Sequence, residues 1–340
     1  MLDWMENRVG DFSRNDKLEH LLSELTPPIE IAENSLLNNI TGPHKANLFV
    51  VGCPRAGTTL FMQALASSGE FSYPTNFLSR FFSGLGIGSK IQKMLFNEEF
   101  QFRNELGISK LTPQKQNYNS ELGKTNGALS PHVFWYFWYK HFKYNETSYL
   151  TKLQWDNSDI TRFINECHVF TNEWKKPSVM KAMIMNWNLT DFADIFESSL
   201  FVRLKRDKYS LANSILKARL NYSGAIDNWW SFKPPEFVNI RKLTPREQVA
   251  AFIISNEKAL DYAEKNIDSS RFISIDYDDF CRNPAEELKK LKIMFSHTGD
   301  NLNLTNVGEG IQVNKRLSED EISDWEEDFL NAKQKIKYLY

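Results

Sequence analysis

The sequence predicts a three-layer α/β fold in which a parallel sheet is flanked by helices. Two short apolar runs, Asn47–Val51 and Leu200–Leu204, are typical of strands that are buried on both faces of a parallel sheet. The first run is followed by a glycine-rich loop over 52–57 and by apolar residues at helical spacing over 58–68. Strand, glycine loop and helix in this order are typical of a phosphate-binding loop.

The second half of the chain supplies the other elements of the sheet and its helices. Thr244-Pro245-Arg246-Glu247 is a capping box with proline at the first helical position, and it predicts a long helix toward Lys265. Further strands are predicted over 179–184 and 271–276, and further helices over 188–198, from 208 to 220 and after Asn283. These signals place most of the sheet after residue 175.

We expect one domain over residues 1–340, with three additions to the sheet. Residues 1–45 form an N-terminal helical extension, residues 70–175 a long irregular and helical insertion, and residues 317–340 a C-terminal helix. Within the insertion, Gly84-x-Gly86-x-Gly88 lacks a preceding strand and predicts a flexible loop. The aromatic run 133–139 favours core packing, with a place in a binding cleft as the alternative.

Composition excludes several classes of protein. The 41 basic and 43 acidic residues give a net charge of −2, which argues against nucleic acid as a partner. The longest apolar stretch, Val133–Tyr139, is too short to cross a bilayer, and the N-terminus has no apolar signal core. Cys53, Cys167 and Cys281 form no disulfide framework and no metal-ligand spacing, so we expect a cytoplasmic protein without a metal site.

The loop from Gly52 to Thr59 carries the chemistry of an anion site. Its members are Gly52, Cys53, Pro54, Arg55, Ala56, Gly57, Thr58 and Thr59. The glycines allow the backbone to approach an anion closely, and the amides of the loop and of the next helix point toward it. The two threonine hydroxyls can donate to phosphate oxygens, and Arg55 adds a charge and a planar fork.

The loop departs from the ATPase pattern at one position. The glycine spacing of G-x-x-x-x-G-K-[ST] is kept, but Thr58 stands where the lysine belongs, and the cation is Arg55 inside the loop. A nucleoside triphosphate with magnesium normally requires that lysine. The substitution favours an anionic nucleotide whose transferred group is not a γ-phosphate.

The stretch Gly52–Leu60 resembles the phosphosulfate-binding loop of the sulfotransferases that use 3′-phosphoadenylyl sulfate (PAPS). A second family signature is a strand ending in arginine with a serine eight residues later, and Arg206 and Ser214 have this spacing. The resemblance spans roughly residues 47–316 and implies that these two residues hold the 3′-phosphate. It also places a basic loop of the nucleotide site at 308–316, which implies Lys315 or Arg316 as a further phosphate contact.

The resemblance implies in-line transfer of a sulfuryl group from PAPS to a hydroxyl or an amine. Arg55 would stabilise the leaving bridging oxygen, and Lys181 either stabilises the transferring group or is a strand-end charge. Many relatives carry a histidine where this chain has Met183, so the general base is open. His132 is the first candidate because its ordinary pKa suits a base, with a structural histidine as the alternative; Glu121 and His44 are weaker candidates.

Two other classes of function stay open at this point. A nucleotide-dependent kinase would use the same kind of loop, but the missing lysine and the Arg206–Ser214 pair count against it. A non-catalytic protein that binds a nucleotide or a glycan would explain Met183. The acceptor is expected to be a small molecule, lipid-like or carbohydrate, and oligomeric state cannot be derived from the sequence.

Overall fold

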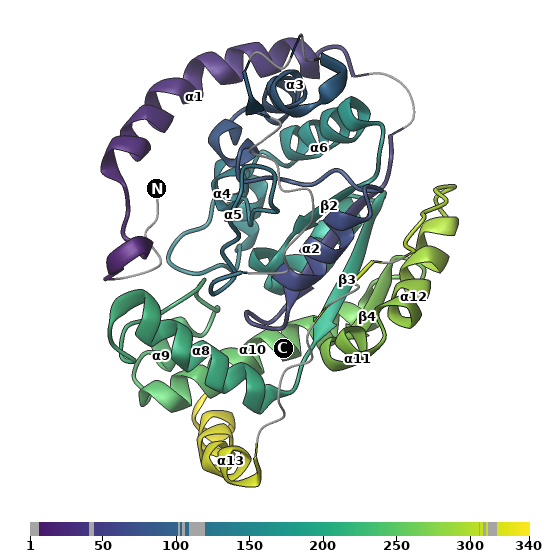
Figure 1. Cartoon of the computed structure of the whole chain (residues 1–340). Helices are drawn as coiled ribbons and strands as arrows, with labels where there is room; N and C mark the ends of the chain where they lie inside the picture. Colours follow the sequence, from purple (N-terminus) through teal and green to yellow (C-terminus); the bar gives the residue numbers. More distant parts are fainter. Residues whose placement is uncertain are drawn as a thin grey trace.

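A computed structural model describes residues 7–40, 44–100, 103, 106–108, 120–305, 307, 308, 311 and 318–340. Within these residues the sheet has four parallel strands in the order β2-β1-β3-β4, with helices on both faces (Figure 1). The strands are β1 (Asn47–Gly52), β2 (Ser178–Lys181), β3 (Ser199–Lys205) and β4 (Phe272–Asp276). The predicted three-layer, P-loop-like α/β fold is therefore confirmed.

The helices follow the predicted order along the chain. The insertion over residues 70–175 contains more helices than the sequence indicated. Those before β2 are α1 (Asp16–Leu37), α2 (Thr58–Ser67), α3 (Leu85–Phe96), α4 (Trp135–His141), α5 (Lys152–Asp156) and α6 (Ile160–Trp174). Those after it are α7 (Leu189–Ile195), α8 (Lys208–Ser223), α9 (Phe237–Ile240), α10 (Pro245–Asn266), α11 (Tyr277–Arg282), α12 (Pro284–Ser296) and α13 (Glu319–Lys335). Short 3₁₀ turns are η1 (Gly10–Phe12), η2 (Leu78–Phe81), η3 (Glu98–Phe100) and η5 (Met183–Asn188).

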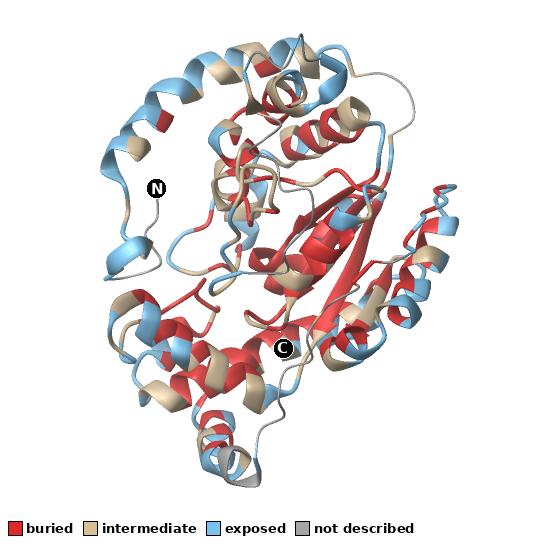
Figure 2. Cartoon of the chain, in the orientation of Figure 1, coloured by how far each residue is buried: buried red, intermediate tan, exposed pale blue. Residues whose placement is uncertain are grey.

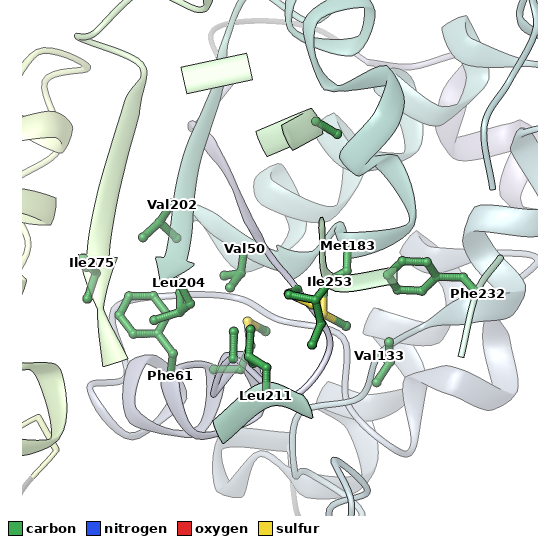
Figure 3. Close-up of a cluster of buried hydrophobic side chains, with 14 of the residues drawn as sticks. Val50, Phe61, Val133, Met183, Val202, Leu204, Leu211, Phe232, Ile253 and Ile275 are labelled. Atoms are coloured by element: carbon green, nitrogen blue, oxygen red, sulfur yellow. The ribbon is translucent and has the colours of Figure 1, made fainter. Parts of the chain in front are cut away.

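Strand β1 separates two hydrophobic cores because successive side chains of a strand point to opposite faces. Leu48 and Val50 belong to one core, and Phe49 and Val51 to the other. Figure 3 shows the first core, in which Val50 of β1 lies near Met183. Figure 2 shows that most of α2 and of the strands is buried, and β1 is buried at every position. Burial on both faces explains why β1 is an unbroken apolar run.

Strand β2 ends earlier than the sequence indicated. The predicted strand 179–184 is paired only to Lys181, and from Met183 the chain turns into η5. Asn186 in η5 donates its Nδ2 to the Gly52 carbonyl at 3.1 Å and to Asn256 Oδ1 at 2.8 Å. These buried hydrogen bonds outweigh the strand preference of the local residues and tie the turn to the loop that follows β1.

The N-terminal extension and the insertion pack together through a buried carboxylate. Glu33 of α1 accepts hydrogen bonds from the amides of Gly86 and Ile87, at 2.8 and 2.9 Å, in the first turn of α3. The predicted flexible loop over Gly84, Gly86 and Gly88 is therefore wrong, because these residues enter a helix. The glycines are needed for close packing, since a Cβ on Gly86 would lie 2.5 Å from Val169 of α6.

Two helices in the second half begin at the predicted caps, Thr244 and Asn283, and a third begins at Asp207, for which no cap was predicted. The Thr244 side chain accepts from the Glu247 amide, which opens α10 with the expected capping box. Asp207 caps α8 and Asn283 caps α12 in the same way. The chain after α13 returns to η5, where the Tyr340 hydroxyl donates to the Trp187 carbonyl at 2.6 Å.

Candidate active site

A cavity of about 190 Å³ lies where the carboxyl ends of all four strands meet. In an open parallel sheet this edge is the usual place for a ligand. The cavity is lined by Pro54, Arg55, Gly57, Thr58, Thr59, Leu60, Ser120, Leu122, Gly123, Lys124, Val133, Trp135, Lys181, Met183, Arg206, Tyr222, Trp230, Ser231 and Tyr277. Of the residues that the sequence singled out, this set contains Pro54, Arg55, Gly57, Thr58, Thr59, Lys181, Met183 and Arg206, and it does not contain Gly52, Cys53, Ala56, Ser214, His132, Glu121 and His44.

The backbone of the loop after β1 adopts the conformation of an anion cradle. Gly57 has a φ of 94° and precedes α2, and no side chain caps the first amides of that helix. A Cβ on Gly57 would lie 2.1 Å from the Tyr277 ring, so only glycine fits here. Arg55 has a φ of 75°, which is strained for a residue with a side chain. The first amides of α2 are thus available for a negatively charged group.

Two arginines and a serine from separate elements meet at this loop. Arg55 Nε donates to Ser214 Oγ of α8 at 2.9 Å, and Arg206 after β3 donates through Nη1 to the Arg55 carbonyl at 2.8 Å. The Arg206 guanidinium stacks 4.5 Å from the centre of the Tyr277 ring, which fixes its plane. Burial and the neighbouring Arg206 charge lower the pKa of Arg55. The site therefore concentrates positive charge and would gain from a bound anion.

Lys181 is a buried cation at the end of β2, with 4% of its surface exposed. Its Nζ donates to Thr59 Oγ1 at 2.5 Å. Burial, with help from the charges of Arg55 and Lys124, lowers the pKa of Lys181 to about 7. Lys181 is thus a buried strand-end residue that lies beside the loop and lines the cavity, a position compatible with both roles that the sequence left open.

A histidine that acts as a general base would have to line the cavity with a free ring nitrogen, and neither Met183 nor His132 meets this requirement. Met183 lines the cavity and accepts a hydrogen bond on sulfur from Thr58 Oγ1 at 3.4 Å. His132 does not line the cavity, and its Nδ1 accepts from the Phe134 amide at 2.9 Å. Desolvation, and the charges of Lys124, Arg80 and Lys181, lower the pKa of His132 to about 3. The geometry therefore favours the structural interpretation of His132.

The weaker candidates for a base do not reach the cavity either. His44 stacks on His168 with ring centres 3.9 Å apart, at the start of β1 and thus at the opposite end of the strand from the loop. Glu121 is exposed in a turn and pairs through its backbone with Lys124. Lys315 and Arg316 lie outside the described residues.

The rest of the cavity lining comes from the insertion and from the segment after α8. The insertion supplies Leu122, Val133 and Trp135, and the segment after α8 supplies Trp230 and Ser231. The sequence left two roles open for the aromatic run 133–139, core packing and a place in a binding cleft, and different residues of the run take each role. Trp135 faces the cavity, whereas Phe137 and Trp138 are fully buried in the core.

Sequence reasoning missed two contributors to the site. Tyr277 directly follows β4, and its ring leaves no room for a Cβ at Gly57 and stacks on Arg206. The sequence signal that could have pointed to Tyr277 is its place directly after a predicted strand. Asn186 holds the Gly52 carbonyl, and no local pattern marks it. In the described part of the chain, no group of three or more metal-ligating side chains is gathered. No helix there combines the length and apolarity needed to cross a membrane.

A parallel sheet with an uncapped helix after a glycine loop, and cations from neighbouring strand ends, is the arrangement of an anion-binding site in an α/β protein. The model of the sulfotransferase family matches residues 47–294, more than half of the chain. The chain therefore belongs to the sulfotransferase family, and it is a transferase that moves a sulfuryl group from a donor. The kinase alternative is not favoured.

One solved structure shares this fold at low sequence identity, and a second shows a weaker likeness. Sulfotransferase STF9 from Mycobacterium avium has 13% identity and a TM-score of 0.57, with 95% of this chain and 84% of that chain covered. Sulfotransferase STF1 from Mycobacterium tuberculosis H37Rv also has 13% identity, with a TM-score of 0.47 and coverage of 91% and 81%. No relative is found among the curated proteins.

Proposed function

We propose that this sulfotransferase takes its sulfuryl group from PAPS and transfers it to a small-molecule acceptor. The observation that carries the proposal is the meeting of Arg55, Arg206 and Ser214 at one loop, although they come from three separate elements. A nucleotide with phosphates at two positions of its ribose explains why cations lie on both sides of the loop. A single phosphate chain would need only the loop and the start of α2.

The two phosphates of the donor divide these groups between them. The 5′-phosphate lies against the amides of the loop and of α2, with Thr58 and Thr59 as hydroxyl donors. The 3′-phosphate lies between Arg206 and Ser214, where a planar fork and a hydroxyl suit a dianion. Arg206 is already oriented by Tyr277, so less side-chain entropy is lost on binding.

Transfer itself depends on charge stabilisation and positioning. The acceptor oxygen forms a bond to sulfur, and the bond between sulfur and the bridging oxygen of the 5′-phosphate breaks. The bridging oxygen keeps the electron pair and leaves on 3′,5′-adenosine bisphosphate (PAP). Arg55 stabilises that developing charge, and Lys181, protonated in the presence of the donor, stabilises the sulfuryl oxygens.

The proton of the acceptor goes to water in this mechanism. By analogy with phosphoryl transfer, the transition state is loose, so the acceptor oxygen has formed little of its new bond when the old one breaks. Once that bond has formed, the proton on the oxygen is acidic enough for water to remove it. Met183 in place of a histidine is then compatible with activity.

Calorimetric titration with PAP, ADP and ATP–Mg²⁺ tests the choice of donor. We expect tight binding of PAP alone and a loss of about 10- to 100-fold in affinity in Arg206→Ala, because a charge-assisted contact to phosphate is removed. Arg282→Ala is a matched control, since Arg282 is exposed and pairs only locally with Asp279. Preference for ATP–Mg²⁺, or equal loss in both variants, would contradict the proposal.

We also propose that residues 1–340 act as a single domain in the cytoplasm. Support for the compartment comes from the cysteines, because Cys53, Cys167 and Cys281 are all buried and unpaired. A reporter fused to the chain and imaged in its cell of origin tests this.

A further inference from the structure

We propose that a second cavity, at the outer edge of the sheet, is a binding site for a small aromatic carboxylate. We call it the edge cavity, and it has a volume of about 250 Å³. The side chains of its lining that bear on the ligand are those of Tyr73, Gln92, Lys93, Phe96, Trp174 and Lys176. The site is separate from the active site and does not depend on the identity of the sulfuryl donor.

The edge cavity lies at the opposite end of α2 from the active-site cavity. Thr58 and Thr59 in the first turn of α2 line the active-site cavity, whereas Ala66 near the end of the helix lines the edge cavity. Ser72, also in the lining, pairs with Ser178 at the start of the edge strand β2. Among the described lining residues the two cavities have none in common. A ligand in one cavity therefore leaves the other free.

A buried amide on α3 offers a hydrogen-bond donor to the edge cavity. Gln92 is 6% exposed, and its Oε1 accepts from Thr75 Oγ1 at 2.6 Å. The Leu78 amide donates to the same threonine oxygen at 3.0 Å. The Nε2 of Gln92 has no partner in the described part of the chain, and it is not sealed from solvent, so it opens onto the cavity that Gln92 lines. An unpaired donor on a buried side chain is uncommon and calls for an acceptor.

Tyr73 offers a second donor to the same cavity. Its hydroxyl also lacks a hydrogen-bond partner among the residues that the structure describes, and it too is open to solvent. Burial raises the pKa of Tyr73 to about 12, so the hydroxyl keeps its proton at neutral pH. An amide and a hydroxyl thus open onto one cavity, and a ligand with two acceptor oxygens satisfies both.

The charges around the edge cavity favour a negative ligand. Lys93 and Lys176 line it, and the described lining residues include no aspartate or glutamate. The nearby Glu173 is already paired, because Lys90 and Lys93 donate to its carboxylate oxygens at 2.7 and 2.8 Å. Lys176 donates to the Gly69 carbonyl at 2.5 Å, which does not balance its charge. Three lysines and one glutamate leave an excess of positive charge that attracts an anion.

Two fixed aromatic rings provide a surface for the apolar part of the ligand. Trp174 Nε1 donates to Ser89 Oγ at 3.1 Å, and Phe96 packs edge-on against Phe77 with ring centres 5.2 Å apart. Lys93 Nζ lies 5.1 Å from the centre of the Trp174 ring, so charge and ring are neighbours. Rings held in this way stabilise a flat apolar group at a low cost in side-chain entropy.

An aromatic carboxylate combines what these groups require. Its ring suits the aromatic surface, its two oxygens accept from the two open donors, and its charge suits the lysines. The volume of about 250 Å³ is below the range of about 300–1,000 Å³ that is typical of sites for drug-sized ligands, so a ligand of one or two rings fits.

The first test compares two probes of similar size and opposite charge by calorimetric titration of the full chain. The probes are 2-naphthoate and 2-naphthylmethanamine, which is protonated at neutral pH. We expect 2-naphthoate to bind with a Kd below about 1 mM and at least about 10-fold more tightly than the amine. Equal affinity for the two probes, or no binding of 2-naphthoate at this concentration, would overturn the inference.

The second test changes one donor at a time. Tyr73→Phe removes only a hydroxyl without a partner, so it should weaken 2-naphthoate binding by about 10-fold and keep the stability of the fold. Gln92→Glu keeps an oxygen that can accept from Thr75 and puts a negative charge in place of the donor, so binding should be lost. Gln334→Glu is the matched control, because Gln334 is exposed on α13, and it should leave the Kd unchanged. Thermal unfolding of each variant shows whether it is folded, and an unchanged Kd in Tyr73→Phe would contradict the site.

A further variant excludes binding in the active site, which is also rich in cations. Lys181 lines the active-site cavity and is not part of the edge cavity, so Lys181→Met should leave the Kd for 2-naphthoate unchanged. A loss of affinity in Lys181→Met that equals or exceeds the loss in Tyr73→Phe would place the probe in the active site and overturn the inference. Titration with PAP is read separately, so failure of the edge site and failure of the proposed donor are distinguishable.

Discussion

Arg55 Nε donates a hydrogen bond to Ser214 Oγ at 2.9 Å, across 159 residues of sequence. The residue proposed to act on the leaving oxygen is thus in contact with a residue proposed to hold the 3′-phosphate. Because the serine oxygen accepts from Arg55, its own hydroxyl hydrogen stays available to donate to a phosphate. Binding of the nucleotide and orientation of Arg55 therefore depend on the same side chain.

We expect Ser214→Ala to weaken PAP binding by about 10-fold, which corresponds to one hydrogen bond to a charged group. The same variant should lower kcat as well, because Arg55 loses the acceptor that orients it. Calorimetry and steady-state kinetics measure the two effects. Ser223→Ala on the same helix is the control, since Ser223 bonds only to nearby carbonyls. Normal kcat with weak binding would separate the two roles of Ser214.

Arg55→Ala should lower kcat by about 10²- to 10³-fold, the usual effect of removing one group that stabilises charge in a transition state. Arg55→Lys should recover part of the loss because it keeps the charge and loses the planar fork. Single-turnover assays with saturating PAPS separate this chemical effect from binding. A kcat near that of the wild type in Arg55→Ala would refute the role.

PAP binding should be coupled to proton uptake by Lys181. The pKa of Lys181 is lowered to about 7 by burial and by the neighbouring cations, so at pH 7.5 much of the amine is neutral. A bound anion favours the charged form and raises the pKa, so a proton is taken from the buffer. Calorimetric titration in triethanolamine and in Tris at pH 7.5, two buffers that bring no competing phosphate, measures this as a difference in apparent binding enthalpy.

The proton uptake should disappear in Lys181→Met, which has a side chain of similar length and no titrating group. A variant at Lys152, which is exposed on α5, should keep it. If the buffer dependence persists in Lys181→Met, another group titrates on binding and the assignment is wrong.

Gly57→Ala should abolish PAP binding and destabilise the fold by about 1–3 kcal/mol, since it adds backbone strain and a clash with Tyr277. Gly69→Ala is a matched control, because Gly69 also has a positive φ, of 72°, but nothing lies within 4 Å of an added Cβ. The control should lose some stability from strain and keep PAP binding. Thermal unfolding and calorimetry check both variants, and PAP binding by Gly57→Ala would contradict the cradle.

His132 should contribute to acid destabilisation of the protein. Its pKa is lowered from 6.5 to about 3 in the folded state, so the unfolded state binds more protons between these values. The free energy of unfolding therefore falls as pH drops from 6.5 toward 3. His132→Asn should flatten this slope, because it removes the group that titrates. The amide oxygen of the asparagine can still accept from the Phe134 amide, so we expect the local structure to be kept. Denaturant unfolding between pH 4 and 7 measures how the free energy of unfolding depends on pH. His297→Asn is the control, because His297 is exposed, and an equal flattening of the slope in this variant would contradict the assignment to His132.

The sequence located strands and caps well where the signal is local. The run Asn47–Val51 became β1 because apolar residues buried on both faces have no other stable place. Thr244 and Glu247 formed the predicted capping box, since both partners lie within one turn. Predictions failed where a distant element decided the outcome. Gly86 entered a helix because Glu33, 53 residues earlier, accepts its amide.

The amino-acid sequence by itself determined the fold class and the glycine loop after β1, and it predicted Arg206 and Ser214 as residues of one site, because these depend on short spacings and on side-chain chemistry. Only the tertiary structure decided what surrounds the loop. It placed the Tyr277 ring against Gly57 and Trp135 in the cavity lining, left His132 out of that lining, and buried Lys181 near other cationic side chains. Such properties arise from desolvation and from contacts between residues far apart in the chain, which no local pattern of residues encodes.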